Sequence, residues 1–156
     1  MKAGFGCVSF DVVIGPLFDL TDDATWYPLV VRVRSREFAA AFASPPCTTY
    51  SKLRNKPGGP PPVRGVEGAS RYGIAGLSIP NQELVRQHKR MSIRVAELLK
   101  IMTELGCPWI VENPARVEGE VSILHLDEYR RLLGTPNVHH AIGVQCTFGA
   151  LSSKPT

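Results

Sequence analysis

The chain has 156 residues, the size of one domain that can bury its own core. Hydrophobic residues make up 44% of it and charged residues 21%, which is typical of a soluble globular protein. No apolar run reaches the ~18 residues of a membrane span and the N-terminus lacks a signal-peptide pattern, so we expect an intracellular protein without a membrane partner. The net charge of +4 permits a phosphate-rich partner but does not require one.

Three elements are expected in the first third of the chain. Residues 7–14 (CVSFDVVI) are apolar and β-branched, which is typical of a strand buried on both faces. Asp22 and Asp23 favour a helix start, although Pro28 must kink this helix or move its start. Residues 38–43 (FAAAFA) predict a short strand that the following Ser-Pro-Pro ends.

A long loop and the longest helix are expected next. Prolines and glycines cluster over residues 57–76, which favours a loop. Residues 81–105 predict a helix that Gly106 ends, with most of its basic residues off the apolar stripe. That stripe consists of Val85, His88, Met91, Val95, Leu98, Met102 and Leu105.

The remaining elements complete an alternating pattern. Residues 108–111 predict a strand, residues 122–133 a helix and residues 141–146 a last strand. Strands that alternate with helices imply an α/β fold with a mostly parallel sheet and helices on both faces. Ligands of such sheets bind at the carboxyl ends of the strands. Two strands end there in Pro-Pro-Cys (45–47) and Glu-Asn-Pro (112–114), so we expect both tripeptides to face one crevice.

Cys47 is the candidate nucleophile. Two prolines fix the backbone before it, nearby residues carry hydroxyls, and Lys52 and Arg54 add positive charge, which favours the reactive thiolate. The alternative is a small buried cysteine after a turn. The four cysteines of the chain lie far apart and form no Cys-x-x-Cys pair, so we expect free thiols and no metal site.

Glu112 is the second candidate catalytic residue. It ends an apolar strand, where a carboxyl group is costly unless something pairs with it. It could hydrogen-bond the edge of a base or donate a proton. The alternative is a carboxylate that braces the loop beside Asn113.

These motifs carry a family resemblance. Residues 44–47 (Ser-Pro-Pro-Cys) resemble the Pro-Cys nucleophile motif of cytosine-5 DNA methyltransferases. Residues 109–114 resemble their Glu-Asn-Val motif, with Pro in place of Val, and Phe148-Gly149 before Lys154 is similar to a later aromatic-Gly segment. The closest resemblance is to a divergent branch in phage-like and mobile-element sequences, carried by residues 19–23, 44–47, 59–65 and 145–156.

The resemblance implies a Rossmann-like fold, a cofactor and a mechanism. Asp11, Asp19 and Pro45 would contact S-adenosylmethionine, with Asp11 at the ribose and Asp19 at the adenine. The target cytosine would be flipped out of double-stranded DNA. The Cys47 thiolate would add to carbon 6 while Glu112 holds the ring, and carbon 5 would then take the methyl group.

Basic residues of the long loop would contact DNA phosphates, or would merely be solvated. These candidates are Lys52, Arg54, Lys56, Arg64 and Arg71, with Lys154 near the C-terminus.

The resemblance also implies an incomplete domain. The family begins with a strand and a Gly-rich turn that have no counterpart here, and no target-recognition domain follows. We therefore expect residues 1–156 to form a partial methyltransferase domain that binds S-adenosylmethionine weakly and methylates DNA poorly or not at all. Two alternatives stay open. One is an amino-methyltransferase, although its Pro-Pro-aromatic motif would have Cys47 at the aromatic position; the other is a nucleic-acid-binding domain without turnover.

Overall fold

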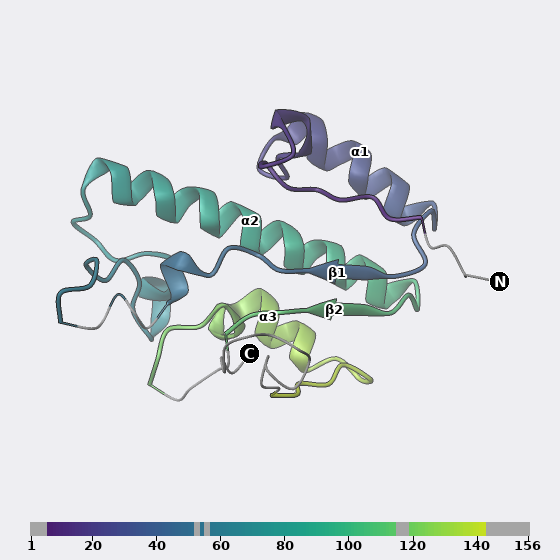
Figure 1. Ribbon diagram of the computed structural model, residues 1–156. Coiled ribbons are helices and arrows are strands. Elements are labelled where there is room, and N and C mark those ends of the chain that lie inside the picture. The colour runs from purple at the N-terminus through teal and green to yellow at the C-terminus, as the bar shows by residue number, and fades with distance from the viewer. Residues whose placement is uncertain (1–5, 52–53, 55–56, 115–118, 143–156) are drawn as a thin grey trace, which may run out of the picture.

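The computed structural model describes residues 6–51, 54, 57–114 and 119–142. Over these residues the chain forms three α-helices and two strands (Figure 1). In chain order they are α1 (Asp23–Arg34), β1 (Ala41–Ala43), α2 (Ile79–Glu104), β2 (Trp109–Val111) and α3 (Asp127–Leu133). The 3-10 turn η1 (Pro16–Phe18) precedes α1, and η2 (Thr48–Tyr50), η4 (Gly68–Tyr72) and η5 (Ile123–His125) lie between the later elements.

The two strands pair directly and in parallel, and the long helix α2 connects them in the sequence. Ala41 lies opposite Trp109 and Ala43 opposite Val111, so both predicted strands are confirmed, at three residues each. The chain returns through α2, as a parallel connection requires. Both strands run toward the end of the molecule where α2 begins, and the loop after β1 occupies that end (Figure 1).

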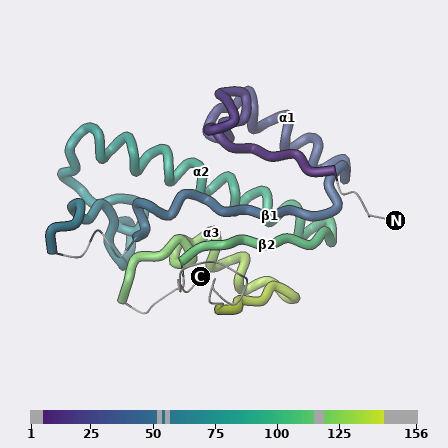
Figure 2. The backbone as a smooth tube through the Cα atoms, viewed as in Figure 1, coloured from purple at the N-terminus to yellow at the C-terminus, as the bar shows by residue number. Residues whose placement is uncertain are grey.

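The core has two parts, which share α2. One lies among α2, α3 and η5, where Leu99, Ile123 and Leu126 are fully buried. The other lies between α1 and the second half of α2 and includes Leu29 and Met102. Figure 2 shows α1 and α3 on different sides of α2.

One face of the strand pair is covered and the other is not. Ala43 and Val111 pack against the core of α2 and α3. Phe42 and Ile110 point to the opposite face, where their side chains are 70% and 64% exposed. The described residues thus supply helices for one face of this pair, and a sheet with helices on both faces stays a prediction.

The predicted strand at residues 7–14 is wrong. This segment has no strand pairing up to Asp11 and then turns. The Asp11 carboxylate accepts a hydrogen bond from the Val13 amide at 2.9 Å, and the Asp11 carbonyl accepts one from Ile14 at 2.9 Å. These local bonds compete with a sheet ladder, and Gly15 with the following proline ends the segment. Instead of being buried on both faces, Val13 is 89% exposed.

The predicted helices are confirmed with small changes. Asp22 caps α1 by accepting a hydrogen bond from the Ala24 amide, and the helix continues through Pro28 rather than starting after it. α2 begins at Ile79, and Gly106 follows its end in a left-handed conformation (φ +69°). Arg94 departs from the expected pattern because its side chain is buried.

The C-terminal expectations are confirmed in part. Residues 122–133 form η5 and α3 rather than one helix, because Leu126 between them has an extended backbone (ψ 145°). The last predicted strand, residues 141–146, lies mostly outside the described residues, and its first two residues have no strand conformation. Among the described helices, none has both the length and the apolar character needed to cross a bilayer.

Candidate functional site

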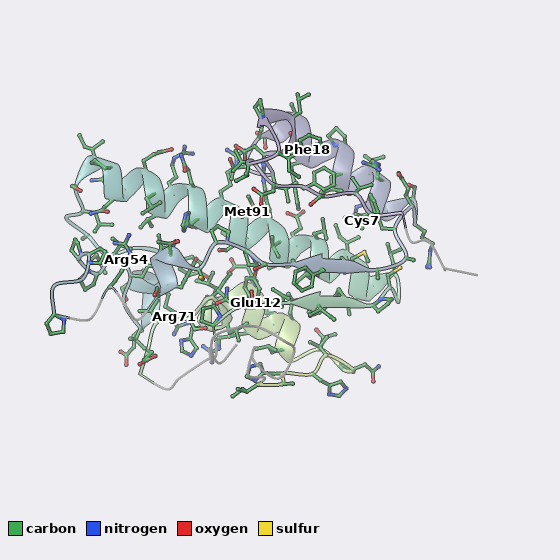
Figure 3. The ribbon with its side chains drawn as sticks, viewed as in Figure 1. Cys7, Phe18, Arg54, Arg71, Met91 and Glu112 are labelled. Carbon is green, nitrogen blue, oxygen red and sulfur yellow. The ribbon has the colours of Figure 1, made fainter. Side chains whose placement is uncertain are left out.

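The ends of β1 and β2 bring the two candidate motifs together. The Glu112 amide donates to the Ala43 carbonyl at 2.9 Å and so extends the parallel pairing by one step. Directly beside it, Ser44 Oγ donates to Glu112 Oε2 at 2.8 Å. The carboxylate that sequence analysis selected is therefore held by the first residue of the Ser-Pro-Pro-Cys motif. Figure 3 shows Glu112 near the middle of the molecule, at the end of β2.

Cys47 stands at the start of a tight turn. The Cys47 carbonyl accepts a hydrogen bond from the Tyr50 amide at 2.8 Å, which closes the 3-10 turn η2. We call residues 47–50 with this hydrogen bond the Cys47 turn. Pro45 is buried, whereas the Cys47 thiol is free and half-buried. A half-buried thiol after a fixed proline pair is positioned without being sealed from a substrate.

A buried arginine fixes the far side of this turn. Arg64 is only 3% exposed, and its Nε donates to Thr49 Oγ1 at 3.0 Å. Its other two nitrogens donate to backbone carbonyls, Nη1 to Arg71 at 2.9 Å and Nη2 to Val85 at 3.2 Å. One guanidinium thus connects the Cys47 turn, the loop and α2. Burial lowers the pKa of Arg64, yet a guanidinium stays charged at neutral pH.

The hydrogen bonding continues from Thr49 to α2. Thr49 Oγ1 lies 3.3 Å from His88 Nδ1, and Thr49 is 2% exposed. Because Arg64 Nε can only donate, Thr49 accepts from it and has its own proton available for the imidazole. Burial, and then the charges of Arg64 and Arg54, lower the pKa of His88 below its ordinary value of 6.5.

Tyr50 also fixes the Cys47 turn, through an aromatic ring that packs against Arg64. The Arg64 guanidinium lies over its ring at 4.1 Å from the centroid, and its hydroxyl donates to Ser92 Oγ at 3.3 Å. Desolvation raises the pKa of this buried phenol. Thr49 and Tyr50 of the turn after Cys47 are therefore as buried as the core that Tyr50 joins.

The predicted phosphate contacts are mostly used inside the protein. Arg64 faces inward and uses its hydrogen bonds inside the protein, and a role of this residue at a DNA phosphate stays a prediction. Arg71 donates to the Val66 and His125 carbonyls and pairs with Asp127. Arg54 donates to the Thr48 and Pro61 carbonyls at 3.1 and 2.9 Å. Figure 3 shows Arg54 and Arg71 at the loop end of the molecule. The other candidates, Lys52, Lys56 and Lys154, lie outside the described residues.

The two acidic cofactor candidates brace their own turns. The Asp11 carboxylate accepts from the Val13 amide and the Asp19 carboxylate from the Thr21 amide at 2.7 Å. Carboxylates at the surface can also accept from ribose hydroxyl and adenine amino groups, which is the chemistry an S-adenosylmethionine site needs. The observed bonds give these two residues a structural role, so no reaction step below depends on them.

A cavity of about 220 Å³ lies on the far side of β2. It is lined by Asn113 of the Glu-Asn-Pro motif and by side chains of β2, α3 and residues 138–141, but not by Cys47 or Glu112. Asn113 is 8% exposed, and its Nδ2 has no hydrogen-bond partner in the structure. Within the described ranges, His, Cys, Asp and Glu side chains form no group of three that could hold a metal ion.

In comparisons with known proteins, no protein-family model, curated protein or solved structure matches the chain. The residues that sequence analysis missed are Thr49, Arg64 and His88 as one hydrogen-bonded unit. Thr49 was interpreted as a hydroxyl near the thiol, Arg64 as a phosphate contact and His88 as part of an apolar stripe. The one signal available was His88 itself, a polar ring on an otherwise apolar helix face.

Proposed function

We propose that this chain carries the base-modifying half of a cytosine-5 methyltransferase-like site, with Cys47 as the nucleophile and Glu112 as the group that holds the cytosine. The observation that supports it is the parallel pairing of β1 and β2, with the Ser44 to Glu112 hydrogen bond of 2.8 Å at its end. This pairing joins the two segments, 68 residues apart, that the chemistry needs side by side.

The proposed chemistry begins with the Cys47 thiolate. Its sulfur forms a bond to carbon 6 of a flipped cytosine, and the bond between carbons 5 and 6 loses its double character. Glu112 stabilises the resulting charge by hydrogen bonding to the ring nitrogen and amino group. S-adenosylmethionine would supply an electrophilic methyl group for carbon 5 and would leave as S-adenosylhomocysteine. Loss of the carbon 5 proton then restores the double bond and expels the Cys47 thiolate.

Ser44 adds a specific role to this proposal. Its hydroxyl donates to Oε2 of Glu112 and so fixes the orientation of the carboxylate. A fixed carboxylate meets a base edge with less loss of conformational freedom than a free one. Ser44 is thus a positioning residue for Glu112, and Glu112 is the residue that touches the base.

A methyl-transfer assay tests the proposal. Duplex DNA is incubated with the protein and S-adenosylmethionine labelled in its methyl group, and label in DNA is counted. Because the domain is expected to bind S-adenosylmethionine weakly, we expect only slow transfer to carbon 5 of cytosine by the unchanged chain at high cofactor concentration, and none by Cys47→Ser, with Cys107→Ser as the matched control. Label on the exocyclic nitrogen would support an amino-methyltransferase instead. Equal transfer by Cys47→Ser would overturn the nucleophile.

A further inference from the structure

We infer that Arg64, Thr49 and His88 form a proton-sensitive brace that holds the Cys47 turn closed and releases it when His88 becomes charged. This inference rests on the proposed function, in which Cys47 is the nucleophile, and it adds regulation of that nucleophile by pH. The three side chains come from three places in the chain, namely the loop, the turn itself and α2.

The direction of the hydrogen bonds carries the argument. Arg64 Nε donates to Thr49 Oγ1, so the hydroxyl proton of Thr49 can point to His88 Nδ1. A neutral imidazole accepts that proton at Nδ1 when its own proton lies on Nε2. The buried Thr49 hydroxyl then both accepts from Arg64 and donates to His88, and a buried hydroxyl that is fully paired in this way stabilises the turn.

Protonation of His88 breaks this condition in two ways. The Nδ1 atom becomes a donor, so the Thr49 hydroxyl proton loses its acceptor in a buried position. A positive ring also repels the neighbouring guanidinium groups of Arg64 and Arg54. The residues one turn away along α2 are Leu84, Val85, Met91 and Ser92, which carry no ionisable group to offset this charge.

The brace reaches Cys47 through the backbone. Thr49 is the middle residue of η2, and the hydrogen bond that closes the turn runs from the Tyr50 amide to the Cys47 carbonyl. Tyr50 is in turn held by the Arg64 guanidinium over its ring. Loss of the contact between Thr49 and His88 therefore loosens the hydrogen bond between the Tyr50 amide and the Cys47 carbonyl, which closes the turn at the nucleophile.

The test compares Thr49→Val, which keeps the shape and removes the hydroxyl, with Thr49→Ser, which keeps the hydroxyl. Amide exchange at Tyr50 reports the closed turn, and iodoacetamide labelling of Cys47 reports release of the thiol. In Thr49→Val we expect Tyr50 protection to fall and Cys47 labelling to rise, each by about tenfold, as for loss of one buried hydrogen bond. Thr49→Ser should restore both values, and labelling of Cys107 should stay unchanged throughout.

The pH dependence provides the second arm. Tyr50 protection in the unchanged chain should fall as the pH drops below 6.5, the ordinary pKa of histidine, and His88→Gln should remove that fall because glutamine accepts a hydrogen bond without titrating. A Tyr50 amide unaffected by Thr49→Val, or a pH-dependent loss that persists in His88→Gln, would overturn the brace. Both readouts need no DNA, so a working brace in a protein whose methyl transfer does not depend on Cys47 would refute the proposed function alone.

Discussion

The N-terminal segment and the loop after β1 both lack strands over most of their length, yet they are fixed very differently. In residues 6–15, apolar side chains such as Val13 point into solvent, and the backbone is held by local bonds to Asp11. In residues 57–76, Val63 and Arg64 are 1% and 3% exposed. The difference teaches that a buried cation with several backbone acceptors can fix a loop, whereas apolar residues without an opposing surface do not.

The largest expected effect comes from removing the buried cation. Arg64→Met should lower the free energy of unfolding by about 3 kcal/mol, because it removes three charge-assisted hydrogen bonds and leaves buried acceptors unpaired. Arg64→Lys should recover little, since one ammonium cannot reach three acceptors in the geometry of a guanidinium. Urea unfolding measures both. A loss below about 0.5 kcal/mol in Arg64→Met would remove the contrast between the two segments.

A matched pair of valines makes the comparison sharper. Val63→Ala should cost about 2 kcal/mol, because the side chain is buried and its removal leaves a cavity. Val13→Ala should change the free energy of unfolding by less than about 0.5 kcal/mol, because that side chain is already exposed. Similar costs at the two positions, measured by the same urea unfolding, would mean that the Val13 side chain is packed against another surface.

A smaller effect is expected from pH. Burial, followed by the charges of Arg64 and Arg54, lowers the pKa of His88, so the unfolded chain takes up a proton at a higher pH than the folded one. Stability from the neutral ring is complete above pH 6.5 and is lost as the pH falls from there toward the folded pKa. His88→Gln should flatten this part of the pH profile of unfolding. A profile with the same slope in His88→Gln would assign the effect to other groups.

The smallest expected differences are in thiol labelling. Cys7 lies in the exposed N-terminal segment and should react with iodoacetamide like an unfolded thiol. Cys47 and Cys107 are both half-buried, but Cys107 packs beside the apolar cluster of α1 and α2. We therefore expect Cys47 to react faster than Cys107, as read by mass spectrometry of the folded protein. Equal rates would show that the position of Cys47 confers no advantage.

Much of the fold followed from the sequence where the local signal and the packing agree. α2 was predicted to within two residues because its apolar stripe, its length and Gly106 all point the same way. The strands at Ala41–Ala43 and Trp109–Val111 were found because Pro-Pro and Glu-Asn-Pro mark their ends. The strand predicted for residues 7–14 was wrong because the hydrogen bond from the Val13 amide to the Asp11 carboxylate favours a turn over a strand. The periodicity of the sequence does not reveal this competition.

Of the candidate site, only the two proposed reactive residues, Cys47 and Glu112, could be predicted from the sequence. Cys47 and Glu112 could be chosen because polar residues at strand ends of a parallel sheet share one edge. The hydrogen bonds among Thr49, Arg64 and His88, which fix the Cys47 turn, could not be predicted, because these residues are far apart in the sequence and come together only in the fold. An arginine in a Pro-Gly-rich loop has the same sequence pattern whether it faces DNA or the core, and burial decides between them.

The measurement that tests the central claim most directly is release of tritium from carbon 5 of labelled cytosine in duplex DNA, without any cofactor. Addition of the Cys47 thiolate to carbon 6 leaves charge at carbon 5, which takes a proton from water; loss of the label and expulsion of sulfur then regenerate both base and thiolate. We predict release by the unchanged chain, none by Cys47→Ser, and a strong reduction by Glu112→Gln. Release that survives in Cys47→Ser, or no release by a folded protein that binds the DNA, would contradict the account.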